Sequence, residues 1–530
     1  MRVEVAVLIM YFILMVGVGV YWNKRAKKSE DYLLGGRSMG PFITALTLQT
    51  TAMSGYMFMG GPAYAYSVGW FALFYAIGDA GGGLVNITVL SRRMRRLSQI
   101  LDCISPIEYL EKRYESVGVK AIAAVIAIFG LSGYVLAQFL STGTTLVSLF
   151  HFPFAWGLII GVGVILIYTF VGGYFAVAYN DVIQGIIMIT AVIGVLVLAV
   201  GQVGGLGELN SKLAEIDPTY LSVWGKGLEY QNGWGVIAGA VLIYLVGYMG
   251  LPHCVIKHMA LNSPKDAKTT MVYATIWNQL FIFSPYILGI CGIVIFGADH
   301  YQGNGAEMVI PDLAFKLFPG FIAAIVLTAI MSAIMSTVAA LLMLTGTVLS
   351  VDVYKRWLRP DATDKQLLLT SRIMILAVAV VGLIIAIVQP PGVFGLVIFA
   401  FGVMACAFLP SYVCAVYWKK ANAVGSIVSM VTGAITNVVW TAAELEAVTK
   451  MHPFFMGLIV SSLAMFIFSR FGKPISDQMK DNMDRAKGKA KISPKLEGAM
   501  SKTLVSEGKA VSRHLAVKQY VAQRGFNLTC

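Results

Sequence analysis

The sequence is short of charge and of the motifs that hold metals or nucleotides. Only 13% of its 530 residues are charged, whereas soluble domains carry about 25%. Its six cysteines are scattered, and it has only six histidines, with no HExxH, no paired CxxC and no GxxxxGK[ST]. These absences argue against a disulfide framework, zinc hydrolysis and ATP-driven pumping.

Hydrophobic residues make up 58% of the chain and are gathered into long uncharged runs. About 20 such residues are needed to cross a ~30 Å hydrocarbon core. Thirteen runs meet this length, and they predict an all-α polytopic membrane protein with about 13 transmembrane helices. The runs are roughly 4–22, 41–66, 67–90, 119–148, 155–175, 181–201, 234–252, 270–298, 319–350, 370–388, 393–418, 422–443 and 453–469.

Basic residues are distributed unevenly between the two sides that thirteen spans create. Positive charges follow the first run, which indicates an uncleaved anchor (1–22) with its N-terminus outside. Strict alternation then places 35 of the 40 Lys and Arg residues inside, 13 of them in the tail 470–530. The positive-inside rule therefore predicts a multi-pass cell-membrane protein with a cytoplasmic C-terminus. The net charge of +13 needs no nucleic-acid partner, and the basic tail is expected to be mostly disordered.

Two runs contain residues that interrupt helices. The interrupting residues are Ser54, Gly55, Gly60, Gly61 and Pro62 in 41–66, and Gly247, Gly250 and Pro252 in 236–260. Unwound backbone at membrane depth is tolerated only where protein or a water-filled cavity satisfies it. Glycine and proline are common in membrane helices, which would explain one such run, but two at corresponding positions favour a carrier.

The two broken runs divide the central spans into two sets of five, 41–201 and 234–418. Because five is odd, the sets enter the membrane from opposite sides, which is the inverted repeat of secondary transporters. Two further helices (422–469) follow.

The ninth span places polar oxygens on one helix face. Ala333, Ser336 and Thr337 are spaced i, i+3 and i+4, so a carbonyl and two hydroxyls lie together. Neutral oxygens suit a monovalent cation, and carbonyls freed at Thr50 and Met53 would complete a cage. The alternative is that the two hydroxyls only bond carbonyls one turn back in their own helix.

These segments resemble the sodium:solute symporter family, and within it the sodium/proline symporters. The matching motifs are DYLLGGRSMGPFITAL (31–46), MSGYMFMGGP (53–62), YTFVGGYFAVAYNDVIQG (168–185), GYMGLPHCVIKHMA (247–260), MSAIMSTVAALL (331–342) and FGKP (471–474). Pantothenate symporters share the GGRSMG and GGP elements, so the resemblance does not fix the solute. It implies a transporter rather than an enzyme, with no organic cofactor and with Na+ as the coupling ion. Its partners would be a small solute, Na+ and the lipid bilayer.

The resemblance also implies roles for individual residues. The family's central sodium site falls on Thr50, Met53, Ala333, Ser336 and Thr337. The family's acidic residue near the start of the sixth span corresponds to Asp181, which is either a second cation or coupling site or an N-cap of that span. The residues that would line the solute cavity are Ser54, Gly55, Tyr56, Tyr134, Tyr244, Tyr248 and Pro252.

The chain departs from the proline symporters at several of these positions. It has Ala52 where they place an aspartate, Tyr244 where they have tryptophan and Leu251 where they have glutamine. Asp79 is the only acidic residue well inside a predicted span. A carboxylate at that depth is functional by default. We expect Asp79 to replace part of the lost charge or to bind a proton, the alternative being a neutral, hydrogen-bonded side chain.

The sequence thus predicts sodium-coupled symport of a small organic solute, most simply proline or a related amino acid. Pantothenate or a short monocarboxylate is the alternative solute, and a proton-coupled carrier using Asp79 is the alternative mechanism. A transporter-like membrane sensor is the alternative from another class, although the tail is short for a signalling module. A channel is disfavoured because no repeated filter or ring of charge is present.

Overall fold

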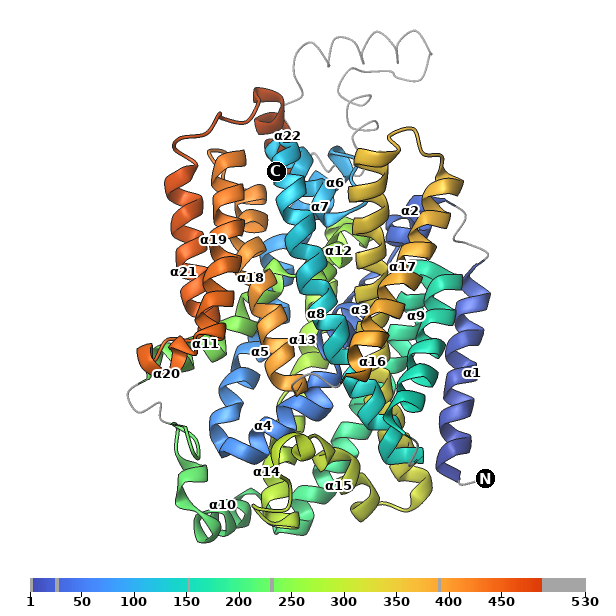
Figure 1. The fold of residues 1–530 in the computed structure, drawn as a ribbon, viewed down its shortest axis with the longest axis vertical. Helices are drawn as coiled ribbons and strands as arrows, with labels where there is room; N and C mark the ends of the chain where they lie inside the picture. Colours follow the sequence, from blue (N-terminus) through green and yellow to red (C-terminus); the bar gives the residue numbers. More distant parts are fainter. Residues whose placement is uncertain (1–2, 24–27, 151–152, 229–232, 389–391, 489–530) are drawn as a thin grey trace, which may run out of the picture.

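The chain folds almost entirely into helices (Figure 1). The computed structural model describes residues 3–23, 28–150, 153–228, 233–388 and 392–488, and these contain no strand. Within them, nine helical stretches are long and apolar enough to cross a membrane. The predicted all-helical membrane fold is confirmed, while the count of thirteen spans and their division into domains stay predictions.

The long helices of the body run side by side along the vertical axis of Figure 1. In chain order the helices of this body are α1 (Val3–Asn23), α3 (Pro41–Ala52), α4 (Gly61–Val68), α5 (Leu73–Asn86), α8 (Val117–Phe150), α9 (Phe154–Val203), α11 (Trp234–Leu245), α12 (Pro252–Ala260), α13 (Ala267–Phe281), α14 (Ser284–Phe296), α16 (Gly320–Thr347), α17 (Asp364–Ile387), α18 (Val393–Tyr417), α19 (Ala423–Ala442) and α21 (Pro453–Phe468). In the apolar segment of the stretch that contains α16, 94% of the residues are buried, whereas the corresponding share is 17% for α17 and 28% for α1. Helix α16 is therefore a central helix, and α1 and α17 lie at the periphery.

Short helices mark the two ends of the bundle. One end, at the top of Figure 1, carries α2 (Ser29–Leu34), α6 (Arg92–Ile100), α7 (Pro106–Tyr114) and α22 (Asp477–Lys487). The other end carries α10 (Leu206–Ile216) and α15 (Val309–Leu317), while α20 (Leu445–Thr449) connects α19 to α21. The elements expected inside thus gather at one end and those expected outside at the other.

Both helix breaks that the sequence predicts are present. Helix α3 ends at Ala52, and the chain resumes as a π-helical turn, η2 (Tyr56–Gly60), that leads into α4. Helix α11 ends at Leu245, and a 3-10 turn, η6 (Gly247–Gly250), precedes α12. Pro252 occupies the first position of α12, where its missing N–H costs nothing. Gly60, Gly61 and Pro62 lie after the first break, within helical structure.

The start of the tail differs from the sequence-based expectation. Residues 477–487 form α22, which packs on α6 instead of being disordered. Lys419 and Asp484 form an ion pair at 2.5 Å, and the Arg96 guanidinium donates to the Ala486 carbonyl at 3.3 Å. Residues 489–530 lie outside the described residues.

Close backbone contact holds the glycine-rich helix α5 against α11. A Cβ added at Gly78 would lie 2.0 Å from the Val241 carbonyl oxygen, an atom that cannot rotate away. At Gly82 the added atom would lie 2.4 Å from the Tyr244 carbonyl oxygen. These glycines set the distance between α5 and the second broken helix.

Gly78→Ala is therefore expected to lower the apparent melting temperature of the purified protein in detergent. Overpacking of this kind costs about 1–3 kcal/mol. Gly163→Ala in α9 is the matched control, because an added Cβ there meets nothing within 4 Å. It should leave the melting temperature unchanged or slightly raised, and an equal drop in both variants would contradict the proposed packing.

Candidate functional site

The end of α3 frees backbone carbonyls in the middle of the bundle. In a continuous helix the Thr50 and Thr51 carbonyls would accept from the N–H groups of residues 54 and 55. Here Ser54 N–H donates to the Ala52 carbonyl at 3.0 Å, and Gly55 N–H donates to the Gln138 side-chain oxygen at 2.8 Å. Both carbonyls therefore need other partners.

Helix α16 supplies those partners from the predicted cation face. The Ser336 hydroxyl donates to the Thr50 carbonyl at 3.0 Å, and the Thr337 hydroxyl donates to the Thr51 carbonyl at 3.0 Å. Each hydroxyl is also within 3.0–3.1 Å of the Ala333 carbonyl. The structure thus brings four of the five predicted sodium ligands together: Thr50, Ala333, Ser336 and Thr337.

Met53, the fifth predicted ligand, is the residue at which α3 ends. It is fully buried, and its ψ of 69° departs from helical values, which turns its carbonyl out of the helical hydrogen-bond pattern. The Thr51 carbonyl is a further oxygen at this position that the sequence did not indicate. Neutral oxygens from two segments thus converge on one point, as a monovalent cation requires.

Asp181 lies beside this cluster but does not cap a helix. It is fully buried within α9, eight residues after the break at Gly173 (φ 59°, ψ −153°), so the N-cap interpretation is wrong. Its carboxylate accepts a hydrogen bond from Thr47, and the Lys257 ammonium lies 3.7 Å away. Lys257 is 1% exposed and donates to Thr47 at 2.9 Å. A basic side chain therefore stands where a second cation was predicted.

The predicted solute-binding residues surround the two helix breaks. Tyr134 donates to the Ser54 hydroxyl at 3.2 Å, and the Tyr56 and Tyr286 hydroxyls are 2.5 Å apart. The Tyr56 and Tyr244 rings are 5.7 Å apart. All seven predicted residues are buried at the breaks or against them: Ser54, Gly55, Tyr56, Tyr134, Tyr244, Tyr248 and Pro252.

Aromatic rings that the sequence did not single out complete this region. Phe401 of α18 packs edge-on against Tyr244 and Tyr248, with centroids 5.0 and 5.4 Å apart. Gln138 and Tyr286 contribute the hydrogen bonds described above. No local motif marks these residues, because they come from helices that meet the breaks only in three dimensions.

Asp79 lies at the edge of the aromatic region, on α5. It is 2% exposed, and its Oδ2 accepts a hydrogen bond from Tyr248 at 3.0 Å. Asn278 of α13 donates to the Asp79 backbone carbonyl at 2.7 Å. The hydrogen bond of the carboxylate is thus to the second broken helix and not to any of the predicted sodium ligands.

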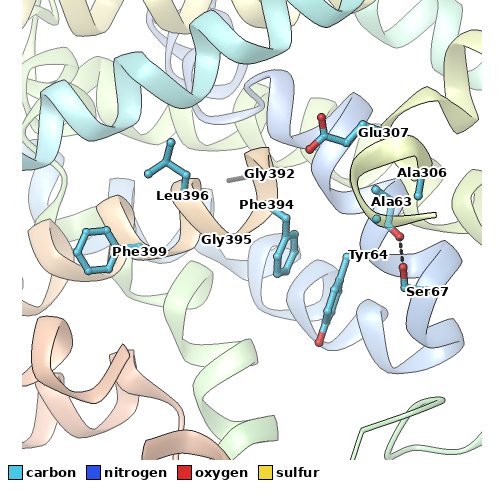
Figure 2. A pocket seen from close by; sticks show the side chains of 11 residues that line it. Ala63, Tyr64, Ser67, Ala306, Glu307, Gly392, Phe394, Gly395, Leu396 and Phe399 are labelled. Atoms are coloured by element: carbon cyan, nitrogen blue, oxygen red, sulfur yellow. Dashed lines mark hydrogen bonds between the residues drawn. The ribbon is translucent and has the colours of Figure 1, made fainter. Parts of the chain in front are cut away.

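A cavity of about 430 Å³ opens beyond the aromatic region, between α4, η8 (Gly303–Met308) and the start of α18 (Figure 2). Phe394 and Tyr64 stack at 4.2 Å on its wall, and Phe394 is also 5.5 Å from the Tyr56 ring. This aromatic layer separates the cavity from the helix break.

Glu307 accepts from the Val393 N–H at 2.8 Å and so caps α18. Burial raises the pKa of Glu307 above its ordinary value, and that hydrogen bond partly offsets the rise.

Comparison with known proteins agrees with this geometry. The model of the sodium:solute symporter family matches residues 32–433. The osmoregulated proline transporter OpuE of Bacillus subtilis (strain 168) is 29% identical over 480 residues, 89% of this chain and 96% of the relative. A sodium/proline symporter of Staphylococcus aureus (strain USA300) is 30% identical over 475 residues, covering 87% of this chain and 91% of that relative.

Solved structures show the same fold. A Na+-coupled sialic acid symporter in a substrate-bound outward-open state superposes with a TM-score of 0.72 at 20% identity, covering 90% of this chain and 99% of that one. Mhp1, a nucleobase-cation-symport-1 family transporter in a closed conformation, superposes with a TM-score of 0.56 at 14% identity and covers 86% and 98%. The protein belongs to the sodium:solute symporter family, and it is a sodium-coupled solute symporter rather than an enzyme.

Proposed function

We propose that this symporter takes up proline or a closely related amino acid together with Na+. The observation that carries the proposal is the convergence of two freed carbonyls and two hydroxyls at residues 50, 51, 336 and 337, directly beside the unwound segment 53–55. The two relatives described above, which are 29% and 30% identical to this chain, are proline transporters. Unwound segments of this kind offer backbone groups to a solute carboxylate, and tyrosines offer rings and hydroxyls.

In the proposed cycle, extracellular Na+ binds the cage first and stabilises the outward-facing arrangement. The solute then binds beside Tyr56 and Tyr248, and one helix bundle rocks against the rest until the site faces the cytoplasm. A tenfold Na+ gradient supplies about 1.4 kcal/mol, and a potential of 100 mV adds about 2.3 kcal/mol. One ion per cycle thus supports roughly 500-fold accumulation.

Contacts at the end carrying α2 and α6 support a gate between the two broken helices. The Met39 N–H donates to the Ala260 carbonyl at 3.2 Å, and the Asn262 N–H donates to the Met39 carbonyl at 2.8 Å. These bonds join the start of the first broken helix to the end of the second. By the positive-inside rule this end faces the cytoplasm, with the N-terminus of α1 outside. Opening of the site to the cytoplasm would require these bonds to part.

We further propose that a single Na+ is coupled to each solute, because Lys257 already supplies positive charge at Asp181. The pair is buried on both sides, with both side chains at most 2% exposed. A buried ion pair leaves no unbalanced negative charge to attract a second cation.

The coupling ion and the solute are tested together in proteoliposomes, by proline uptake under an inward Na+ gradient with K+ as the control. Pantothenate and short monocarboxylates serve as competitors. Thr337→Ala removes a hydroxyl from the cage and leaves a carbonyl unsatisfied, so half-saturation should need at least ~10-fold more Na+.

Thr328→Ala is the control for that variant, because Thr328 lies on the same helix and bonds only one turn back, to the Ala324 carbonyl at 2.8 Å. It should keep the wild-type Na+ dependence. Uptake driven by a proton gradient alone would contradict the proposed coupling to Na+. Na+-driven uptake of pantothenate or a monocarboxylate, with proline inactive, would change the solute and keep the mechanism.

Sodium stoichiometry is tested with Lys257→Met and with Lys257→Met combined with Asp181→Asn. The wild type should show a Na+ Hill coefficient near one. Lys257→Met leaves the buried carboxylate of Asp181 without its ammonium partner, which costs about 3–5 kcal/mol unless a cation takes the place of the ammonium. We expect this variant to lose stability at low Na+ and regain it at high Na+, and the double variant to lose that Na+ response. A Hill coefficient near two in the wild type, reduced by Asp181→Asn alone, would show that Asp181 already binds Na+.

A further inference from the structure

Four acidic side chains are buried within the described ranges of the chain: Asp79, Asp181, Glu307 and Asp352. Two of them have an ammonium partner, and a third lies at a helix N-terminus, where the helix dipole is positive. Lys257 lies 3.7 Å from Asp181, Lys120 lies 3.2 Å from Asp352, and the N-terminal N–H of α18 lies 2.8 Å from Glu307. Asp79 is the exception.

Among the described residues, the contacts of Asp79 include no compensating charge. No ion pair reaches Asp79 from any residue that the structure describes, and its Oδ1 is buried without a hydrogen-bond partner there. Its other oxygen accepts from Tyr248, a neutral donor that does not balance a negative charge. Because an unpaired buried carboxylate is strongly disfavoured, the balancing cation must come from outside the chain or from a proton.

The groups around Asp79 are suited to an organic cation. Tyr248, its hydrogen-bond partner, packs against Tyr244 at 5.8 Å and against Phe401 at 5.4 Å. Aromatic faces of this kind attract ammonium groups, whereas hard cations take a shell of oxygen ligands. The oxygens that would suit Na+ are instead on α3 and α16. Asp79 thus borders the residues proposed for the solute and not those proposed for the ion.

We propose that Asp79 is the counter-ion for a protonated amine on the transported solute and so selects amines over uncharged isosteres. The inference rests on the proposed function, because it assigns one end of the solute in that site. The amine of the solute pairs with Asp79 Oδ1 beside the Tyr248 ring, and its carboxylate lies toward the unwound segment at Ser54 and Gly55. Asp79 would then bind the solute and would not replace the charge that is missing at Ala52.

The test compares L-proline with tetrahydrofuran-2-carboxylate, which has the same ring and carboxylate but an oxygen in place of the protonated amine. Both ligands are titrated against the purified full-length protein in Na+. The wild type should bind proline on the order of 100-fold more tightly, the effect expected when one partner of a buried charge pair is removed. In Asp79→Asn this preference should fall to about threefold or less, with binding of tetrahydrofuran-2-carboxylate and the Na+ requirement retained.

Asp312→Asn is the control, since Asp312 on α15 also accepts from a tyrosine hydroxyl, that of Tyr301 at 2.6 Å, but is partly exposed and has no hydrogen bond to the described residues proposed for the solute. It should keep the wild-type preference. Retained binding of tetrahydrofuran-2-carboxylate in Asp79→Asn shows that the variant is folded, and a melting curve checks this independently.

Other outcomes separate this inference from the proposed function. A full preference for proline in Asp79→Asn would overturn the inference. So would an equal loss for both ligands together with weaker Na+ binding, which would make Asp79 a Na+ ligand, or loss of pH dependence for both ligands, which would make it a proton site. Selective loss of proline binding in Asp79→Asn, in a protein whose uptake needs no Na+, would overturn the proposed coupling and keep the inference.

Discussion

Satisfying the backbone groups that a broken helix exposes in lipid is the constraint on which the rest of this structure depends. No water is present in the hydrocarbon core to bond a free carbonyl or N–H. The first break therefore recruits Gln138 for the Gly55 N–H, and Ser336 and Thr337 for the carbonyls of residues 50 and 51. The candidate cation cluster is a consequence of this repair. A hydroxyl that bonds a freed carbonyl already places two oxygens close together, and the Ala333 carbonyl gives it a second acceptor when a cation takes the first.

Buried charged side chains also need partners, and leaving one unpaired costs more free energy than leaving a backbone group unsatisfied. Buried carboxylates persist where an ammonium or a helix N-terminus lies against them, as at Asp181 and Asp352. These pairs also hold distant segments together: Lys257 of α12 contacts α3 through Thr47 and α9 through Asp181. The ion pair thus joins the second broken helix to α9, and Thr47 links both charged groups to the first broken helix.

The sequence predicted most of what depends on local pattern. Each of these features is visible within a single segment: the long apolar runs, the two interrupted helices, and the helix face with i, i+3, i+4 spacing at 333–337. The structure contains long apolar helices, both breaks and that face. Predictions failed where a residue's role is set by another segment. Asp181 seemed to begin a helix because the span was placed by hydropathy alone, yet the helix continues through it. The pairing of Lys257 with Asp181 could not be predicted either, because the two residues lie on different helices.

The residues that contact the two helix breaks could not be predicted from the sequence for the same reason. Gln138, Phe401 and Tyr286 lie in runs of ordinary membrane composition, and only the packing of α8, α14 and α18 against the breaks gives them a role. Helix α22 was missed because it lies in a tail whose overall composition is polar and basic. Its stability comes from packing on α6 and from the pair with Lys419, neither of which is visible in its own residues.

The position of the cation cluster also explains how ion and solute binding can be coupled without a long pathway. The carbonyls of residues 50, 51 and 53 and the residues 54–56 proposed for the solute lie along one short stretch of chain in which regular helical bonding stops. A cation that fixes the first group restricts the backbone of the second, so part of the entropy cost of ordering the solute site is met before the solute arrives. By linkage, the solute must then strengthen ion binding by the same factor. Separation of the two sites by even one helical turn of regular structure would weaken this coupling, which gives a physical reason for the break to lie between Ala52 and Tyr56.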